Sequence, residues 1–168
     1  SNLTYLMNYY DKISEGYDEL HKEEQLKKIK IIKQHLDIKQ NSKILDLGCG
    51  PYYGKWDGDV TGVDPSSELL KLAANKGIKT YCEKAEQLSF PDDSFDYIIS
   101  ITAIQNFDDI EQGVKEIKRV TKPEAEVVIT FLKNSSKKQE IIKIIRKHFN
   151  TTKEIEEDKD IILFMKMR

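Results

Sequence analysis

The chain has 168 residues, with 27 Lys and Arg against 29 Asp and Glu, and a formal net charge of −2. This length and a hydrophobic content of 39% are typical of one compact globular domain with a buried core. The balanced charge gives no basis for binding nucleic acid over a broad surface. No apolar run approaches the roughly 20 residues that a membrane-spanning helix needs, so we expect no membrane contact.

Few residues of the chain suggest metal or disulfide chemistry. The two cysteines, Cys49 and Cys82, have no metal-binding spacing and predict a reducing, cytoplasmic setting. The three histidines are scattered, and we expect no metal site.

Residues 1–36 are predicted to form an N-terminal segment and a helix that precede the main domain. The segment is aromatic and acidic around Tyr10 and Tyr17. A helix is predicted near 22–36, with apolar residues at helical spacing: Leu26, Ile29, Ile32 and Leu36. It also carries several lysines: Lys27, Lys28, Lys30 and Lys33. The pattern favours a solvent-exposed lysine face over a phosphate-binding one.

Residues 37–168 alternate between predicted strands and helices. The strands are predicted at 44–47, 60–63, 78–82, 97–101 and 127–132. The first helix of this region is predicted to open at Ser66 and to end near Gly77, and the next is predicted to be capped by Asp108. Ser136 and Gln139 predict a capping box for a third helix that carries Phe149. This alternation predicts an α/β fold, a Rossmann-like open sheet that is mostly parallel and has helices on both faces.

Two short links refine the predicted topology. Strand-like segments 151–155 and 161–167 are separated only by 156–160, so they must pair antiparallel as a C-terminal hairpin. Only residues 51–59 separate Gly50 from the second strand. A first crossover helix of three turns does not fit there, and we expect a single turn or an irregular loop with Trp56 over the sheet.

A glycine-rich turn follows the first strand, in the sequence Ile44–Gly50, and the second strand ends at Asp64. In doubly wound sheets this arrangement forms a nucleoside pocket at the carboxyl ends of adjacent strands. Gly48 and Gly50 lack a β-carbon, which allows a tight turn and the close approach of a ligand. Asp64 is then placed to accept hydrogen bonds from ribose hydroxyls.

With these residues in order, the chain resembles the class I S-adenosylmethionine-dependent methyltransferases, and in particular the methyltransferase type 11-like domain. The motifs that carry the resemblance are Ile44–Gly50, Val60–Asp64, Ala85–Asp96, Glu116–Pro123 and the terminal hairpin. The resemblance implies a seven-stranded sheet and S-adenosylmethionine as cofactor, with S-adenosylhomocysteine as product. Pro123-Glu124-Ala125 stands where the family usually has a Pro-Gly-Gly turn.

The resemblance also implies roles for particular residues. Asp46 orients the methionine amino group, Asp64 binds the ribose, and Ala85 with Glu86 lines the adenine. The remaining positions that it implies for cofactor binding are Tyr10, Tyr17, Gly48, Cys49, Gly50, Pro65 and Ile101. Tyr10 and Tyr17 are candidates for covering the cofactor, and packing on an N-terminal helix is an equally favoured role for them.

The methyl acceptor is not identified by the sequence, and no catalytic residue is assigned. Gln105 and Asn106 are candidates for positioning an acceptor, or equally for capping the helix that follows. The short link after the fifth strand leaves no room for a lid. An open site suits a macromolecular acceptor, such as a tRNA or protein residue, or completion by a partner subunit.

Two other classes of protein remain as alternatives. In the family that the chain resembles, a third glycine is usual near position 52, but here the turn continues as Pro51-Tyr52-Tyr53-Gly54. A non-catalytic methyltransferase-like scaffold or regulatory subunit is compatible with this altered turn, because fold alone does not establish activity. A nicotinamide dinucleotide-binding oxidoreductase shares Gly48, Gly50 and Asp64. It is disfavoured because the third glycine of its fingerprint is absent and the chain ends in a hairpin.

Overall fold

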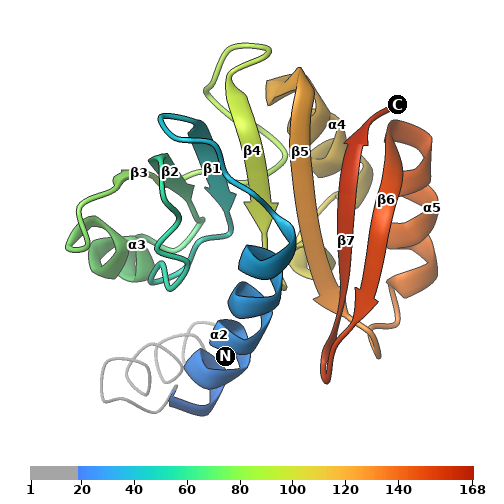
Figure 1. Ribbon diagram of the computed structural model, residues 1–168, viewed down its shortest axis with the longest axis horizontal. Coiled ribbons are helices and arrows are strands. Elements are labelled where there is room, and N and C mark those ends of the chain that lie inside the picture. The colour runs from blue at the N-terminus through green and yellow to red at the C-terminus, as the bar shows by residue number, and fades with distance from the viewer. Residues whose placement is uncertain (1–18) are drawn as a thin grey trace.

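The computed structural model describes residues 19–168, which form a seven-stranded sheet with helices on both faces (Figure 1). The strands are β1 (Lys43–Leu47), β2 (Asp59–Val63), β3 (Lys79–Tyr81), β4 (Phe95–Ser100), β5 (Thr121–Leu132), β6 (Phe149–Glu156) and β7 (Asp160–Met167). The helices are α2 (Glu19–His35), α3 (Ser67–Ala74), η1 (Ile104–Asn106), α4 (Ile110–Val120) and α5 (Lys138–His148).

The strand order is β3-β2-β1-β4-β5-β7-β6. The first five strands pair in parallel, and β7 lies antiparallel between β5 and β6. The predicted Rossmann-like sheet with an antiparallel C-terminal hairpin is therefore confirmed. The link between β6 and β7 is too short for a crossover, which forces the chain to reverse beside β5.

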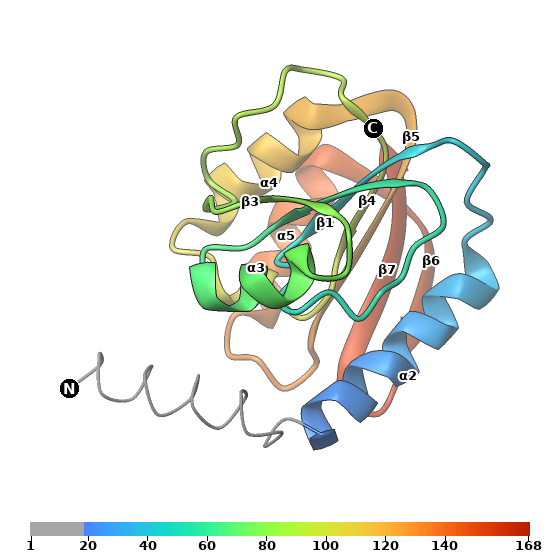
Figure 2. The same cartoon turned by 90° about the vertical axis from the view of Figure 1, so that its left-hand side faces the viewer.

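Each face of the sheet is covered by its own hydrophobic cluster. Leu45 and Leu47 of β1 face the cluster under α4 and α5, whereas Ile44 faces the cluster under α2 and α3. Figure 2 shows α2 on the opposite side of the sheet from α4 and α5. Because side chains alternate along a strand, Asp46 points to the α2 face between two residues that face α4 and α5.

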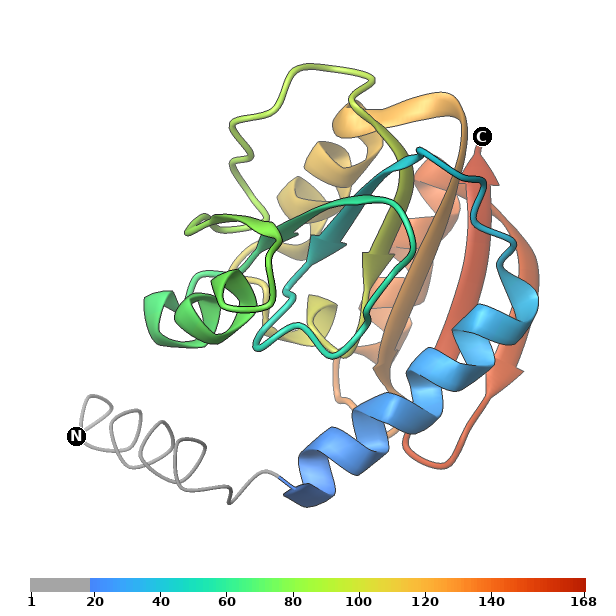
Figure 3. The same cartoon turned by 60° about the vertical axis from the view of Figure 1, so that its left-hand side comes forward.

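The link between β1 and β2 contains no helix, as the sequence indicated (Figure 3, where it runs in teal between α3 and α2). Trp56 is buried against the sheet, and its backbone N–H donates to the Tyr52 hydroxyl over 2.9 Å. A Cβ on Gly54 would overlap the Trp56 indole, so the absence of a side chain at Gly54 lets the backbone contact that ring. The aromatic side chains of this loop fill the space that a first crossover helix normally occupies.

The predicted starts of two helices were wrong. Asp109, not Asp108, caps α4, and its side chain accepts from the N–H of Gln112. Asp108 is instead paired with Lys84 over 2.8 Å. The predicted capping box at Ser136 does not form, because α5 begins after Lys137 with no side-chain cap.

Two further boundaries differ from the sequence prediction. Strand β5 begins at Thr121, so Pro123-Glu124-Ala125 lies within the strand, and its register with β4 shifts between Phe95 and Tyr97. Such an irregularity accommodates a proline that cannot donate to the ladder. Phe149 begins β6 instead of continuing α5, because the chain must turn there to pair with β7.

The N-terminal region is described only from Glu19 onwards. Tyr10 and Tyr17 lie outside the described residues, and the division of the chain at residue 36 stays a prediction. Within residues 19–168, no helix combines the length and the apolar character that crossing a membrane requires.

Candidate active site

A cavity of about 460 Å³ lies at the carboxyl ends of β1, β2 and β4. Its walls are formed chiefly by residues 47–51, 63–65, 83–86 and 101–103. His21 and Gln25 of α2 complete the wall on the side of that helix. In open α/β sheets, ligands bind in the crevice outside the carboxyl ends of the strands. The structure thus brings most of the residues predicted for the site to one cavity.

The glycine turn is held against the end of β2 by backbone hydrogen bonds. The N–H groups of Gly48 and Cys49 both donate to the Val63 carbonyl, over 2.7 and 3.0 Å. Gly48 has a φ of +76°, and a Cβ there would lie 2.6 Å from the Cβ of Ala103. Gly50 has a φ of +50°. Only glycine meets both requirements at the first position, the left-handed backbone and the close approach.

The Cys49 thiol is buried beneath this turn, and it packs against Gly62 of β2. Burial and the neighbouring carboxylates raise the pKa of the thiol well above its usual range. A thiol that stays protonated is a poor nucleophile, so the contribution of Cys49 to the cavity is its small volume.

The Asp64 carboxylate closes the turn at the end of β2. One oxygen accepts from the N–H of Gly50 and the other from the N–H of Ser66, each over 2.9 Å. Burial raises the pKa of Asp64, while these two backbone hydrogen bonds act in the opposite direction. An ionised carboxylate offers about four lone-pair positions, so two remain for hydroxyl donors in the cavity.

Asp46 has a different environment from the other predicted site residues. Its Oδ2 accepts from Nε1 of Trp56 over 2.9 Å, and its side chain is not part of the cavity wall. Burial raises the pKa of Asp46 to about 7, with a smaller contribution from the charge of Asp64. The Asp46 carboxylate therefore stabilises the loop that follows the glycine turn by its hydrogen bond with Trp56.

The 83–86 wall is fixed by contacts with α4. Oε2 of Glu86 accepts from the N–H of Asp109 over 2.9 Å, and the Glu86 carbonyl accepts from Nε2 of Gln112 over 3.2 Å. Ala85 and Glu86 both line the cavity, as does Pro65.

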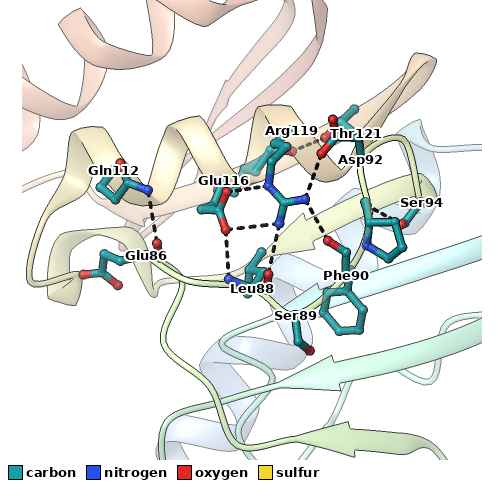
Figure 4. A network of polar contacts seen from close by, with 12 residues as sticks. Glu86, Leu88, Ser89, Phe90, Asp92, Ser94, Gln112, Glu116, Arg119 and Thr121 are labelled. Atoms are coloured by element: carbon teal, nitrogen blue, oxygen red, sulfur yellow. Dashed lines mark hydrogen bonds and ion pairs between the residues drawn. The ribbon is translucent and has the colours of Figure 1, made fainter.

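The chain that follows this wall is held by Arg119 of α4 (Figure 4). The Arg119 guanidinium donates to the carbonyls of Leu88 and Phe90, over 3.0 and 2.7 Å. It also pairs with Glu116, whose carboxylate accepts from the N–H of Leu88 over 2.9 Å. A planar guanidinium with several donors suits this arrangement of backbone carbonyls and a carboxylate.

The residues after β4 form the wall on the side of β5. Ile101 and Asn106 line the cavity, whereas Gln105 faces a neighbouring hollow that 134–137 and 158–159 also line. Nε2 of Gln105 donates to the Thr102 carbonyl over 2.9 Å. Neither side chain caps α4, so the helix-capping alternative for Gln105 and Asn106 is wrong.

Sequence reasoning missed the contribution of α2 and of Thr102. Lys28 was predicted to be exposed, but its side chain is buried and pairs with Asp160 over 3.2 Å. Asp160 is remote in sequence, and no local pattern indicates that the two charges meet.

Within residues 19–168, no group of three or more His, Cys, Asp or Glu side chains is placed to hold a metal ion.

Comparison with known proteins identifies the family. Residues 45–129 match the family model described as "Methyltransferase domain". The chain belongs to this family, the class I S-adenosylmethionine-dependent methyltransferases, as the sequence motifs indicated. The matched residues include most of β1, the glycine turn, Asp64 and most of β5.

Individual relatives agree with the family assignment. The chain is 34% identical over 111 residues to a demethylmenaquinone methyltransferase of Lysinibacillus sphaericus, covering 56% of this chain and 46% of that protein. The chain spans about half to two thirds of the length of the curated relatives it matches first, between 46% and 64%.

Solved structures share the fold at low identity. An S-adenosylmethionine-dependent methyltransferase of Aquifex aeolicus has a TM-score of 0.72 at 17% identity, covering 83% of this chain and 89% of that one. A Haloferax volcanii methyltransferase-fold protein, solved in complex with the Trm112 methyltransferase activator, has a TM-score of 0.80 at 16% identity. That match covers 95% of this chain and 97% of the other.

Proposed function

We propose that the protein transfers a methyl group from S-adenosylmethionine to an acceptor that approaches the cavity from the side of β4 and β5. The observation that carries this proposal is the position of the cavity. It joins the glycine turn, Asp64 and the 83–86 wall at the carboxyl ends of β1 and β2. The family supplies the class of reaction, and the cavity supplies a place for it.

The residues present fit such a cofactor. A cavity of about 460 Å³ is within the range of roughly 300–1,000 Å³ that is usual for small-molecule sites. At Gly50 the nearest atom to an added Cβ is 4.0 Å away, so the backbone is open to a ligand there. Asp64 keeps lone pairs for the ribose hydroxyls, and Ala85 with Glu86 faces the position proposed for the adenine.

The methionine end of the cofactor is proposed to lie over the glycine turn, toward α2. Asp46 is turned away from this region and bonded to Trp56, so it acts on the cofactor only through the turn that it supports. The backbone of residues 48–50 and the side chains of His21 and Gln25 are the polar groups that face this end.

The cofactor supplies an activated methyl group on a sulfonium, which is already a good leaving group. The protein then has to hold the donor and the acceptor in line and to exclude water. The walls at 63–65 and 83–86 fix the nucleoside, while the 101–103 wall and Asn106 face the side from which an acceptor can enter. Asn106 is our candidate for hydrogen bonding to the acceptor.

The proposed acceptor is a macromolecule, a tRNA or a protein, with a partner subunit as a second way to complete the site. The support is the short connection from β5 to α5, residues 133–137, which provides no lid over the cavity. The Haloferax volcanii neighbour bound to an activator shows that a protein of this fold can assemble with a second subunit.

The proposal is tested first by calorimetric titration with S-adenosylmethionine and S-adenosylhomocysteine. Saturable binding of both is expected. No heat of binding at millimolar cofactor would contradict the proposal and favour the scaffold alternative.

The acceptor is then sought with radiolabelled S-adenosylmethionine and fractionated cell extract. Label in RNA or protein is expected. Label only in small molecules, such as the quinone type that one relative's name suggests, would contradict the macromolecular acceptor but leave methyl transfer standing.

A further inference from the structure

A buried polar cluster joins α2, the residues after β4, strand β5 and the start of β7 directly beside the cavity. Nζ of Lys28 lies 3.2 Å from Oδ1 of Asp160, and both side chains are almost fully buried. Nζ of Lys28 also donates to the Thr102 hydroxyl over 2.7 Å. The hydroxyls of Thr102 and Thr130 both donate to Oδ2 of Asp160, over 2.6 and 2.7 Å. The side chains of Lys28, Thr102, Thr130 and Asp160 together form the Lys28 cluster.

The Lys28 cluster holds Thr102 in a backbone conformation that it rarely adopts. Thr102 has a φ of +52°, which is a true outlier for a β-branched residue. Its N–H donates to the Thr130 hydroxyl over 2.9 Å, and its carbonyl accepts from Gln105 over 2.9 Å. Strained residues persist only where the surroundings over-determine them, and they gather at functional sites.

Only one member of the cluster reaches the cavity. Thr102 is part of the wall, whereas Lys28, Thr130 and Asp160 lie behind it. One turn before Lys28 on α2, Gln25 also lines the cavity, with its Oε1 3.5 Å from the Thr102 hydroxyl. The cluster thus connects two parts of the wall that come from segments far apart in sequence.

A buried ion pair is weak support for stability by itself, because the cost of removing two charges from water offsets their attraction. Apolar side chains at these positions would join α2 to the sheet equally well. The charges and hydroxyls add a fixed direction for each bond, and each of the other three side chains of the cluster forms a hydrogen bond with Thr102.

We propose that Lys28 and Asp160 are positioning residues for the cofactor site, which fix Thr102 and the Gln25 side of α2 in the geometry that binding needs. This inference rests on the proposed function, and it concerns residues that do not touch the cofactor. Loss of either charge leaves the other buried without its partner, which releases Thr102 and α2 from the cavity wall.

The test measures S-adenosylhomocysteine affinity by calorimetry at a temperature where each variant is fully folded by circular dichroism. Asp160→Asn is expected to weaken binding at least about tenfold. The double variant Lys28→Met with Asp160→Asn, which removes both charges, is expected to recover only part of the affinity and to stay more than about threefold weaker than the wild type, because the bond from Lys28 to Thr102 is also lost. Hydrogen exchange of α2 in the bound state is expected to rise in the single variant and to fall back in the double variant.

A matched control and a milder variant make the test decisive. Asp96→Asn changes the same group at the opposite end of the sheet, where Asp96 accepts from the Lys43 N–H and pairs with Lys122, and it is expected to leave affinity unchanged. Thr130→Val keeps both charges and the side-chain shape, and it is expected to weaken binding because Thr102 loses a partner. If Asp160→Asn does not fold, the affinity of Thr130→Val for S-adenosylhomocysteine tests the inference instead.

Equal affinity of the folded Asp160 and Thr130 variants and the wild type would overturn the inference and leave the proposed function intact. Absence of binding by the wild type would instead overturn the proposed function. A double variant that binds as tightly as the wild type would also overturn the inference, because it would show that apolar packing positions Thr102 equally well.

Discussion

Asp64→Ala is expected to weaken the binding of S-adenosylhomocysteine by about 10- to 150-fold. The carboxylate is buried, and backbone N–H groups 2.9 Å away hold each oxygen toward the end of β2. Its free lone pairs are the proposed acceptors for the ribose hydroxyls. Hydrogen bonds to a charged group contribute about 1.5–3 kcal/mol, and each 1.4 kcal/mol is tenfold in a dissociation constant.

Calorimetric titration measures this affinity directly, and Ser66→Ala is the matched control. Ser66 lies two residues further along, outside the cavity wall, and its side chain caps α3 by accepting from the N–H of Leu69. Its loss is expected to cost about 1 kcal/mol of stability and to leave affinity unchanged. If Asp64→Ala binds the ligand as tightly as the wild type, the nucleoside pocket is not at Asp64 and the reasoning is refuted.

Three further predictions concern the supports of the cavity. Because burial raises the pKa of Asp46 from 3.8 to about 7, the contribution of Asp46 to the free energy of unfolding should be largest below about pH 4 and should fall until about pH 7, by an amount on the order of 4 kcal/mol. Asp46→Asn should remove this slope in urea denaturation series between pH 5 and 8, and an unchanged slope would assign it to another group. Gly48→Ala should destabilise the protein more than Gly77→Ala, since both positions have positive φ but only the first lacks space for a Cβ; equal melting temperatures would contradict the close approach. Arg119→Met should cost about 1–3 kcal/mol in denaturation experiments, because the guanidinium bonds two backbone carbonyls; no loss would mean that solvent replaces these bonds.

Local sequence signals predicted most of the architecture. Ser66 caps α3 as expected, because a serine hydroxyl before an apolar helical pattern satisfies a free N–H group. The short links at 51–59 and 156–160 predicted an irregular loop and an antiparallel hairpin from chain length alone, and both are present. The predicted start of α4 was wrong because two adjacent residues, Asp108 and Asp109, can each cap a helix. Asp108 pairs with Lys84 in the folded protein, and Asp109 caps α4 instead.

Part of the cavity was also predictable from local sequence signals. Gly48, Gly50 and Asp64 follow strands directly, so the strand pattern places them at one edge of the sheet. The role of Asp46 was not predictable, because its orientation toward Trp56 depends on how the 51–58 loop packs.

The sequence by itself determined the class of fold and the family, because periodicity, glycine positions and link lengths act over a few residues at a time. Only the tertiary structure decided that Lys28 is buried and that Thr102 is held in a left-handed conformation. Both depend on Asp160, which the antiparallel hairpin places at the start of β7, beside the end of β5. A charge is exposed or buried according to the partner it meets, and that partner here is more than a hundred residues away.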